Sequence, residues 1–275
     1  MFARPRAVSV AATVVLCVTF AAAKPAAADA WADHVVSFIP GAGADPTFGN
    51  PTVTLGSPER FTGEGVFPSV VSIFSPPFGT DELLSIGFGG SLIVEFDEPI
   101  TDDPGHPSGI DLIVFGNGGF ADADFPNGLI GDPPFTFGLD PMGVSVSADG
   151  VTFVLLGTFT EGLFPTQGYL DSGPFDGTPG NVPTNFTRPV DPTLTLDDFA
   201  GLTLVQALGL YDGSGGGTPI DIGPAGLGAV RFVRIEGVTE GVTVEIDAFA
   251  AVPEPVSANL VLGLIICQAA FRRRW

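Results

Sequence analysis

Glycine and proline recur throughout residues 40–255, and this distribution most limits what the chain can fold into. The 275 residues include 38 glycines and 26 prolines. In a helix interior, glycine costs about 1 kcal/mol and proline about 3 kcal/mol relative to alanine. Long helices are therefore excluded from most of the chain. Short runs of β-branched and aromatic residues stand between the glycines and prolines, and this pattern is typical of an all-β sandwich.

Several of these runs have the two-residue period of a strand. Leu92, Val94 and Phe96 share one face of the run 91–96, which predicts a strand buried on one side. The run 110–115 is apolar except for Asp111, as expected of a strand covered on both faces. Further strands are expected at 35–39, 69–74, 83–86, 230–235 and 242–247. No repeat or change of composition divides residues 31–251, so we expect one all-β domain there.

A hairpin is expected at 143–156. Two β-forming runs, 143–147 and 151–156, flank the tripeptide Ala148-Asp149-Gly150. Asp-Gly between two such runs is a strong hairpin signal, because glycine accepts the positive φ that the turn requires.

One helix is expected after residue 195. Thr195 and Asp198 have the spacing of a capping box, and the helical period continues until about Leu210. The segment 161–192 is dense in proline, glycine, aspartate and threonine and shows little periodicity. We interpret it as a long surface loop or insertion.

Residues 1–30 have the parts of a secretory signal peptide. Two arginines stand among the first six residues, a mostly apolar run follows, and Ala28-Asp29-Ala30 fits the small-x-small cleavage pattern. Cleavage after Ala30 would start the mature chain at Trp31, following export by the Sec machinery. The apolar run is shorter than the ~20 residues that span a bilayer. An uncleaved anchor is the alternative.

The other end of the chain has a three-part pattern. A Pro-Glu-Pro motif precedes the apolar run 256–271, and a basic cluster follows that run: Pro253, Glu254, Pro255, Arg272, Arg273 and Arg274. As a membrane helix the run would reach ~24 Å, against a hydrocarbon core of ~30 Å. A thin or tilted span is feasible, and its arginines would orient the C-terminus toward the cytoplasm.

This order of features resembles the PEP-CTERM sorting tail of bacterial cell-surface proteins, over residues 252–275. The resemblance implies that an exosortase, a membrane enzyme of transpeptidase type, recognises the tail and cuts near Pro-Glu-Pro. A plain C-terminal membrane anchor is the alternative. Both interpretations place residues 31–251 outside the cytoplasm, at the cell envelope, at the cell surface or in the extracellular matrix.

The central part of the chain is strongly acidic. Residues 31–255 contain four arginines, no lysine and 30 acidic residues, which gives a net charge of −26. Nucleic acid is excluded as a partner, because binding its phosphates requires clustered lysine and arginine. Such a charge favours solubility and attracts divalent cations.

The residues that most often carry catalysis are scarce. Cys17 and Cys267 lie in the terminal apolar segments, so residues 31–255 have neither a disulfide nor a reactive thiol. Histidine occurs only at His34 and His106, and we expect His106, between two prolines, to be an exposed loop residue. No complete catalytic constellation is present in the sequence, so we expect no enzymatic activity.

Acidic residues near the predicted strand ends suggest a calcium site. Ca²⁺ binds hard oxygen ligands, and we predict that four aspartates supply them: Asp102, Asp103, Asp111 and Asp247. Arg231 and Arg234 are the competing partners for these carboxylates. The segment 122–133 begins like an EF-hand, but its glycine and proline are out of register, and we reject that motif. Acidic loops without an ion are the alternative.

The strand segments together resemble a bacterial cell-surface domain that is often found before such tails, over residues 80–250. The hairpin and the strand 230–235 are also similar to discoidin-type, galactose-binding-like jelly rolls. The resemblance implies a two-sheet jelly roll with a structural calcium and a loop-borne ligand site. Phe153 stands where the discoidin pattern has tryptophan, and the cysteines of many discoidin domains are absent. No sugar- or lipid-binding residue is therefore transferred.

These observations leave more than one function open. The first is a structural or adhesive component of the cell surface or matrix. The second is a calcium-dependent carbohydrate- or matrix-binding module, with surface polysaccharide as its partner. Trp31 is the only tryptophan in residues 31–255, and we expect most of the 24 phenylalanines to lie in the core. A secreted glycan-active enzyme is the third alternative.

Overall fold

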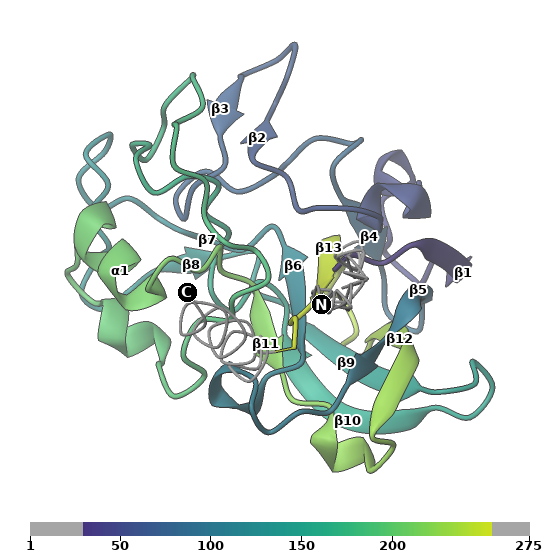
Figure 1. Ribbon diagram of the computed structural model, residues 1–275. Coiled ribbons are helices and arrows are strands. Elements are labelled where there is room, and N and C mark those ends of the chain that lie inside the picture. The colour runs from purple at the N-terminus through teal and green to yellow at the C-terminus, as the bar shows by residue number, and fades with distance from the viewer. Residues whose placement is uncertain (1–29, 255–275) are drawn as a thin grey trace, which may run out of the picture.

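Two antiparallel sheets stacked face to face form the centre of the computed structural model, which describes residues 30–254 (Figure 1). The larger sheet has the order β1-β5-β12-β9-β10, with bounds His34–Ile39, Ser91–Thr101, Ala229–Gly237, Pro141–Ser147 and Val154–Thr160. The smaller has the order β11-β6-β13-β4, with bounds Thr218–Ile220, Leu112–Gly116, Val244–Ala251 and Leu84–Ile86. The predicted two-sheet β-sandwich is confirmed by this strand pairing.

Shorter elements surround the two sheets. Two small sheets pair β2 (Phe61–Thr62) with β3 (Ser69–Val70), and β7 (Gly119–Phe120) with β8 (Thr136–Phe137). The one α-helix of the described residues is α1 (Leu204–Tyr211). The short 3₁₀ helices are η1 (Pro46–Phe48), η2 (Pro51–Thr54), η3 (Pro107–Gly109), η4 (Leu196–Phe199) and η5 (Gly223–Ala225).

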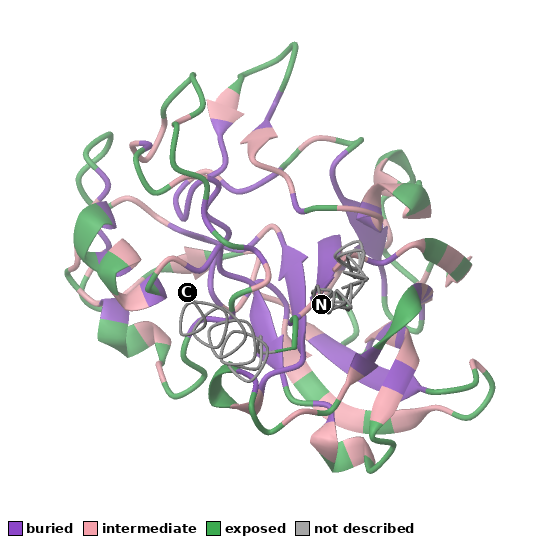
Figure 2. Cartoon of the chain, in the orientation of Figure 1, coloured by how far each residue is buried: buried purple, intermediate pink, exposed green. Residues whose placement is uncertain are grey.

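The main hydrophobic core lies between the two large sheets (Figure 2). Leu92 and Val94 of β5 and Val233 of β12 are fully buried against residues of the smaller sheet, including Ile246. Burying side chains of this kind stabilises the fold by about 1.5–3 kcal/mol each. The core clusters all lie within residues 31–252, so this part of the chain has a hydrophobic core of its own.

Strand β6 is buried along its whole length. One face contributes to the main core, while Ile113 and Phe115 on the other face belong to a separate cluster with Phe186. The ring centroids of Phe115 and Phe186 are 5.3 Å apart in an edge-to-face arrangement, which is a favourable geometry for two aromatic rings. The predicted strand covered on both faces is therefore confirmed.

The predicted hairpin is formed by β9 and β10, but its turn is wider than the Asp-Gly dipeptide. Gly150 has a φ of 73°, as the turn prediction requires. The Asp149 carboxylate accepts hydrogen bonds from the backbone N–H groups of Val151 (2.9 Å) and Thr152 (2.8 Å). These bonds hold the chain in a turn, so the second strand begins only at Val154.

The region predicted as one helix is divided into two. The capping box of Thr195 and Asp198 is present, but η4 ends at Phe199. Gly201 has a φ of 69°, a conformation outside the helical region, and it separates the two helices. A second capping box, in which the Gln206 side chain accepts from Thr203, starts α1.

The segment 161–192 is only partly the surface loop that we predicted. Phe164, Phe186 and Val190 are buried. Arg60 holds the segment from outside: its guanidinium donates to the carbonyls of Gly168 and Thr184 and lies 3.9 Å from the centroid of the Phe186 ring. Buried aromatic residues and this arginine order a segment that has little regular secondary structure.

None of the helices in the described part of the chain is long and apolar enough to cross a membrane. Of the predicted signal peptide 1–30 and sorting tail 252–275, residues 1–29 and 255–275 lie outside the described residues.

Candidate cation site at one end of the sandwich

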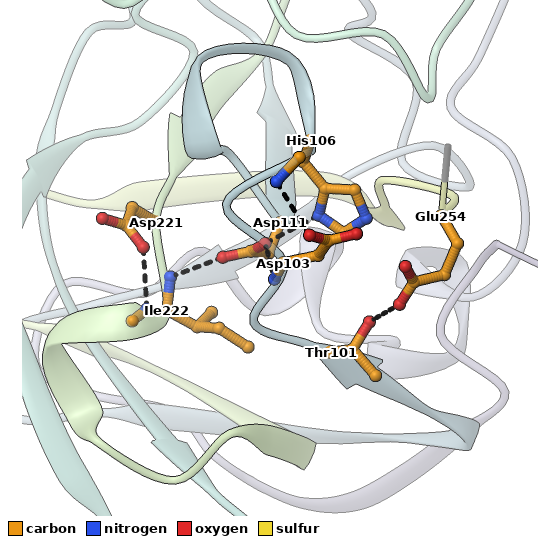
Figure 3. Close-up of polar contacts among 9 residues, drawn as sticks. Thr101, Asp103, His106, Asp111, Asp221, Ile222 and Glu254 are labelled. Atoms are coloured by element: carbon orange, nitrogen blue, oxygen red, sulfur yellow. Dashed lines mark hydrogen bonds and ion pairs between the residues drawn. The ribbon is translucent and has the colours of Figure 1, made fainter. Parts of the chain in front are cut away.

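Asp111 is a buried acidic residue at the start of β6. It is 0% exposed, and its carboxylate accepts from the backbone N–H groups of Ile222 (3.0 Å) and Asp103 (3.3 Å). The Asp111 Oδ1 atom also lies 2.7 Å from His106 Nδ1. These contacts join the loop after β5 to the segment after β11 (Figure 3). A buried carboxylate requires partners of this kind, because leaving it unpaired costs several kcal/mol.

Asp102, Asp111 and Asp221 converge around this point. One carboxylate oxygen from each residue lies within 4.8 Å of the others. Asp102 and Asp221 are exposed, whereas Asp111 is buried. Clustered carboxylate oxygens are the ligands that Ca²⁺ prefers, so the three residues could hold a divalent cation at the surface.

A second group lies beside the first. It contains Asp103, His106 and Glu254, with one donor atom of each within 4.8 Å of the others. The backbone N–H of Gly105 and the neighbouring Glu254 side chain lower the pKa of Asp103, so its carboxyl group is ionised at neutral pH. The Glu254 carboxylate accepts from the hydroxyl of Thr101 at the end of β5.

The prediction that His106 is an exposed loop residue was wrong. It is 3% exposed, because the loop 102–110 folds over Asp111 and places the imidazole against that carboxylate. The other ring nitrogen, Nε2, is buried and has no hydrogen-bond partner among the described residues. A buried polar atom without a partner costs about 1–3 kcal/mol.

Of the four predicted calcium ligands, the structure brings Asp102, Asp103 and Asp111 together but not Asp247. In the pairing of β13 with β6, Leu112 lies opposite Ala251, and Gly116 lies opposite Ile246. Asp247 is therefore four residues from the Asp111 end of the strand, or roughly 13 Å at ~3.3 Å per residue. The reason for this error is strand direction, which the separate segments do not show.

Asp247 belongs to a different acidic environment, next to Glu59. Its carboxylate accepts from the backbone N–H of Glu59 at 3.2 Å. Burial, followed by the charge of Glu59, raises the pKa of Asp247 well above its usual range. Burial, with the charges of Glu82 and other acids, raises the pKa of Glu59 to about 7.

A third acidic environment surrounds Glu161, which is completely buried. Burial and the charges of Asp140 and Glu245 raise the pKa of Glu161 well above its usual range. The backbone N–H of Asn117 donates to Glu161 Oε1 at 2.9 Å. The side chain of Asn117 donates to Glu245.

The arginines that we named as competitors do not contact the predicted ligands. Arg231 lies 3.4 Å from Glu95 and 4.0 Å from Asp97, and Arg234 lies 3.3 Å from Glu236. Asp102, Asp111 and Asp221 therefore have no arginine partner among the described residues.

An open hollow of about 490 Å³ lies elsewhere on the surface. It is lined by residues near β1 and β4, including Phe38, Pro40, Asp45 and Ser85. None of the acidic residues at the Asp111 end lines it.

The sequence reasoning missed Asp221, His106 and Glu254. Asp221 follows β11 and is more than 100 positions from Asp111, so no local spacing links the two. The Pro-Gly-His-Pro context of His106 suggested exposure. Glu254 was assigned only to the sorting motif. Strands β11, β6 and β13 are neighbours in one sheet, and this pairing brings their ends together. The sequence alone does not show which strands pair, so these three residues could not be grouped with Asp111.

Comparisons with known proteins give little guidance to the function. No protein-family model matches the chain, and no curated protein matches it. Among solved structures, the chain is similar to "CBM32 of AlyQ in complex with 4,5-unsaturated mannuronic acid", with 10% identity over 79% of this chain and 95% of that chain and a TM-score of 0.27. It is also similar to a CBM32 domain of a family 31 glycoside hydrolase from Clostridium perfringens, with 13% identity over 62% and 76% and a TM-score of 0.24. Similarity at this level carries no argument about ligand or function.

Proposed function

We propose that this chain is an exported cell-surface protein with a structural or adhesive function and no catalytic activity, stabilised outside the cell by a divalent cation. The observation that supports this most directly is the convergence of Asp102, Asp111 and Asp221 at one end of the sandwich. A domain with a net charge of −26 stores electrostatic self-repulsion. A cation that gathers three carboxylates relieves part of that repulsion and connects the loops after β5 and β11.

Calcium is the ion that fits these three residues best. All three ligands are carboxylates, and two of them lie on exposed loop positions that leave room for water and backbone carbonyls. Calcium accepts 6–8 oxygen ligands in flexible geometry and is abundant outside cells in the millimolar range where weak sites fill.

The export part of the proposal rests on the sequence. The signal peptide pattern at 1–30 and the resemblance of 252–275 to a PEP-CTERM tail support handling by the Sec machinery and then by an exosortase. The partner of the folded part is then a surface or matrix component.

The test of the cation is a melting experiment on residues 31–255. We expect the melting temperature to rise with millimolar calcium and to return with chelator. A ligand at 100 times its Kd adds about 2.7 kcal/mol to the free energy of unfolding. Asp221→Asn should reduce this response, whereas Asp197→Asn, an exposed acid in η4, should not. Equal responses to calcium chloride and to sodium chloride of matched ionic strength would contradict the proposal.

A carbohydrate-binding function is the second candidate, and exposed aromatic rings favour it. Phe125 and Phe135 are 73% and 69% exposed, and the Phe125 ring lies 5.0 Å from that of Phe175. A glycan and polymer binding screen with and without calcium separates the candidates. If a specific glycan binds to the parent chain and not to Phe125→Ala, the carbohydrate-binding function is favoured over a purely structural one.

A further inference from the structure

We propose that Asp103, His106 and Glu254 form a zinc site, separate from the oxygen-only calcium site, that fastens the Pro-Glu-Pro segment to the end of the sandwich. Three independent features support it: a buried imidazole held in one orientation, a buried ring nitrogen without a partner, and two carboxylates from different segments beside it (Figure 3).

The orientation of His106 is set by Asp111. The side chains of both residues are 0% exposed, and Nδ1 lies 2.7 Å from Asp111 Oδ1. Because a carboxylate only accepts hydrogen bonds, Nδ1 carries the proton of this contact, and in the neutral ring Nε2 carries the lone pair. Metal-binding histidines in proteins usually have such an arrangement, with a carboxylate on the nitrogen that does not bind the metal.

The Nε2 atom of His106 is the atom of this group that a metal would use. It is buried and has no hydrogen-bond partner among the described residues. Figure 3 shows the Asp103 carboxylate beside the imidazole ring and the Glu254 carboxylate facing the same region. One ring nitrogen of His106 and one carboxylate oxygen from each of the other two residues lie within 4.8 Å of one another. Zinc bonds of ~2.0–2.2 Å place neighbouring donors ~3.3–3.6 Å apart, so only small side-chain movements are needed.

The donor set selects the metal. Calcium and magnesium bind oxygen almost exclusively, whereas imidazole suits zinc and other transition metals. One nitrogen and two carboxylates, with water as the fourth ligand, match tetrahedral zinc. The neighbouring Asp102, Asp111 and Asp221 offer only oxygen, so the two groups should differ in metal preference.

The position of Glu254 means that a metal bound here would also hold the Pro-Glu-Pro motif. Glu254 is the central residue of Pro253-Glu254-Pro255, and in the structure it contacts Thr101 on β5 as well as the Asp103 and His106 group. A bound zinc ion would tie this residue to the loop after β5. The metal would therefore add a second connection between Glu254 and the domain, beside the hydrogen bond from Thr101.

The test is zinc binding to residues 31–255, measured by isothermal titration calorimetry in a buffer that contains calcium. We expect one zinc ion per chain with a micromolar or lower Kd. His106→Gln should weaken binding at least 100-fold, and Glu254→Gln at least tenfold. His34→Gln, which changes an exposed histidine near Asp97, is the matched control and should bind zinc as the parent chain does.

A spectroscopic measurement identifies the ligands. Substitution with Co²⁺ should give the visible absorption bands of a four-coordinate ion, and these should be lost in His106→Gln. Glu254→Gln changes a surface residue outside the core, so it keeps the test valid if His106→Gln fails to fold. The proposal is overturned if the His106 and His34 variants bind zinc equally well, or if Glu254→Gln binds as tightly as the parent chain. Asp221→Asn should leave zinc binding within twofold, so a failure of the calcium proposal would not be mistaken for a failure of this one.

Discussion

Buried and half-buried carboxylates are the most unusual feature at the scale of the residue. Glu59, Glu161 and Asp247 all have raised pKa values, and burial is the largest cause in each case. Exposed acids such as Asp149 and Asp198 have lowered pKa values, because backbone N–H groups donate to them. The two groups make opposite contributions to the pH dependence of stability.

The buried carboxylates predict a loss of stability as pH rises. A carboxyl group with a raised pKa holds its proton more tightly in the folded state. Its stabilising contribution is complete below the unfolded pKa, near 4.5 for Glu59, and is lost as pH rises through the folded value of about 7. Glu59→Gln should therefore raise the free energy of unfolding at pH 8 by roughly 1–2 kcal/mol, after a discount for solvent screening, and change little at pH 4.

Urea unfolding at the two pH values checks this expectation. The exposed Glu240→Gln serves as the control and should behave as the parent chain at both. An equal effect of Glu59→Gln at pH 4 and pH 8 would show that the carboxyl group is not responsible.

At the scale of the element, the segment 161–192 depends on contacts rather than on regular structure. The backbone N–H of Gly168 donates to Val71 at 2.8 Å, and that of Thr184 donates to Gly168 at 3.1 Å. Arg60 adds hydrogen bonds to both residues and a cation–π contact with Phe186. Val70 and Ser72 also donate to the carbonyls of Asp176 and Pro174, so β3 and the residues after it hold the other part of the segment.

Replacing Arg60 should loosen this segment without unfolding the sandwich. Arg60→Met keeps much of the side-chain length but removes the donors to Gly168 and Thr184. We expect hydrogen exchange at the amides of these two residues to accelerate at least tenfold, while the amides of β5 and β12 stay protected. Arg188→Met, which removes an exposed ion pair with Asp212, is the control. Unchanged exchange at Thr184 would contradict the assignment.

The strands were predictable from sequence because their signals are local. Alternation at Leu92 and Val94, and the continuous apolar run of β6, identify buried faces without knowledge of the partner strands. The helix boundary was misjudged because Gly201 stands within an otherwise helical pattern, and its φ of 69° lies outside the helical region. The candidate cation site was predicted only in part, because Asp221 and His106 reach Asp111 through strand pairing and loop folding, which no local pattern encodes.

At the scale of the whole molecule, the two terminal patterns predict how the protein is processed. Protein recovered from the cell surface should begin near Trp31, because Ala28 and Ala30 fit signal cleavage, and should lack residues beyond Pro255. N-terminal sequencing and mass spectrometry of the intact protein measure both ends. Replacing Arg272, Arg273 and Arg274 by glutamine should impair sorting and leave the melting temperature of the folded part unchanged.

Two results would contradict these expectations. Recovery of Met1 would favour the uncleaved N-terminal anchor. A surface form that retains Trp275 would favour a plain C-terminal anchor over exosortase processing.

The first and last described residues of the sandwich meet side by side. The backbone N–H of Ala251 donates to the carbonyl of Ala30 at 2.6 Å, and Trp31 forms a β-bridge with Ala250. The positions of the chain ends could therefore be changed while the packing of the strands stays the same. A short linker could join the two ends, and new ends could be opened in the turn at Val151, which is 83% exposed. A circularly permuted sandwich of this kind would keep every strand pair of both sheets, since domains with adjacent ends tolerate such rearrangement.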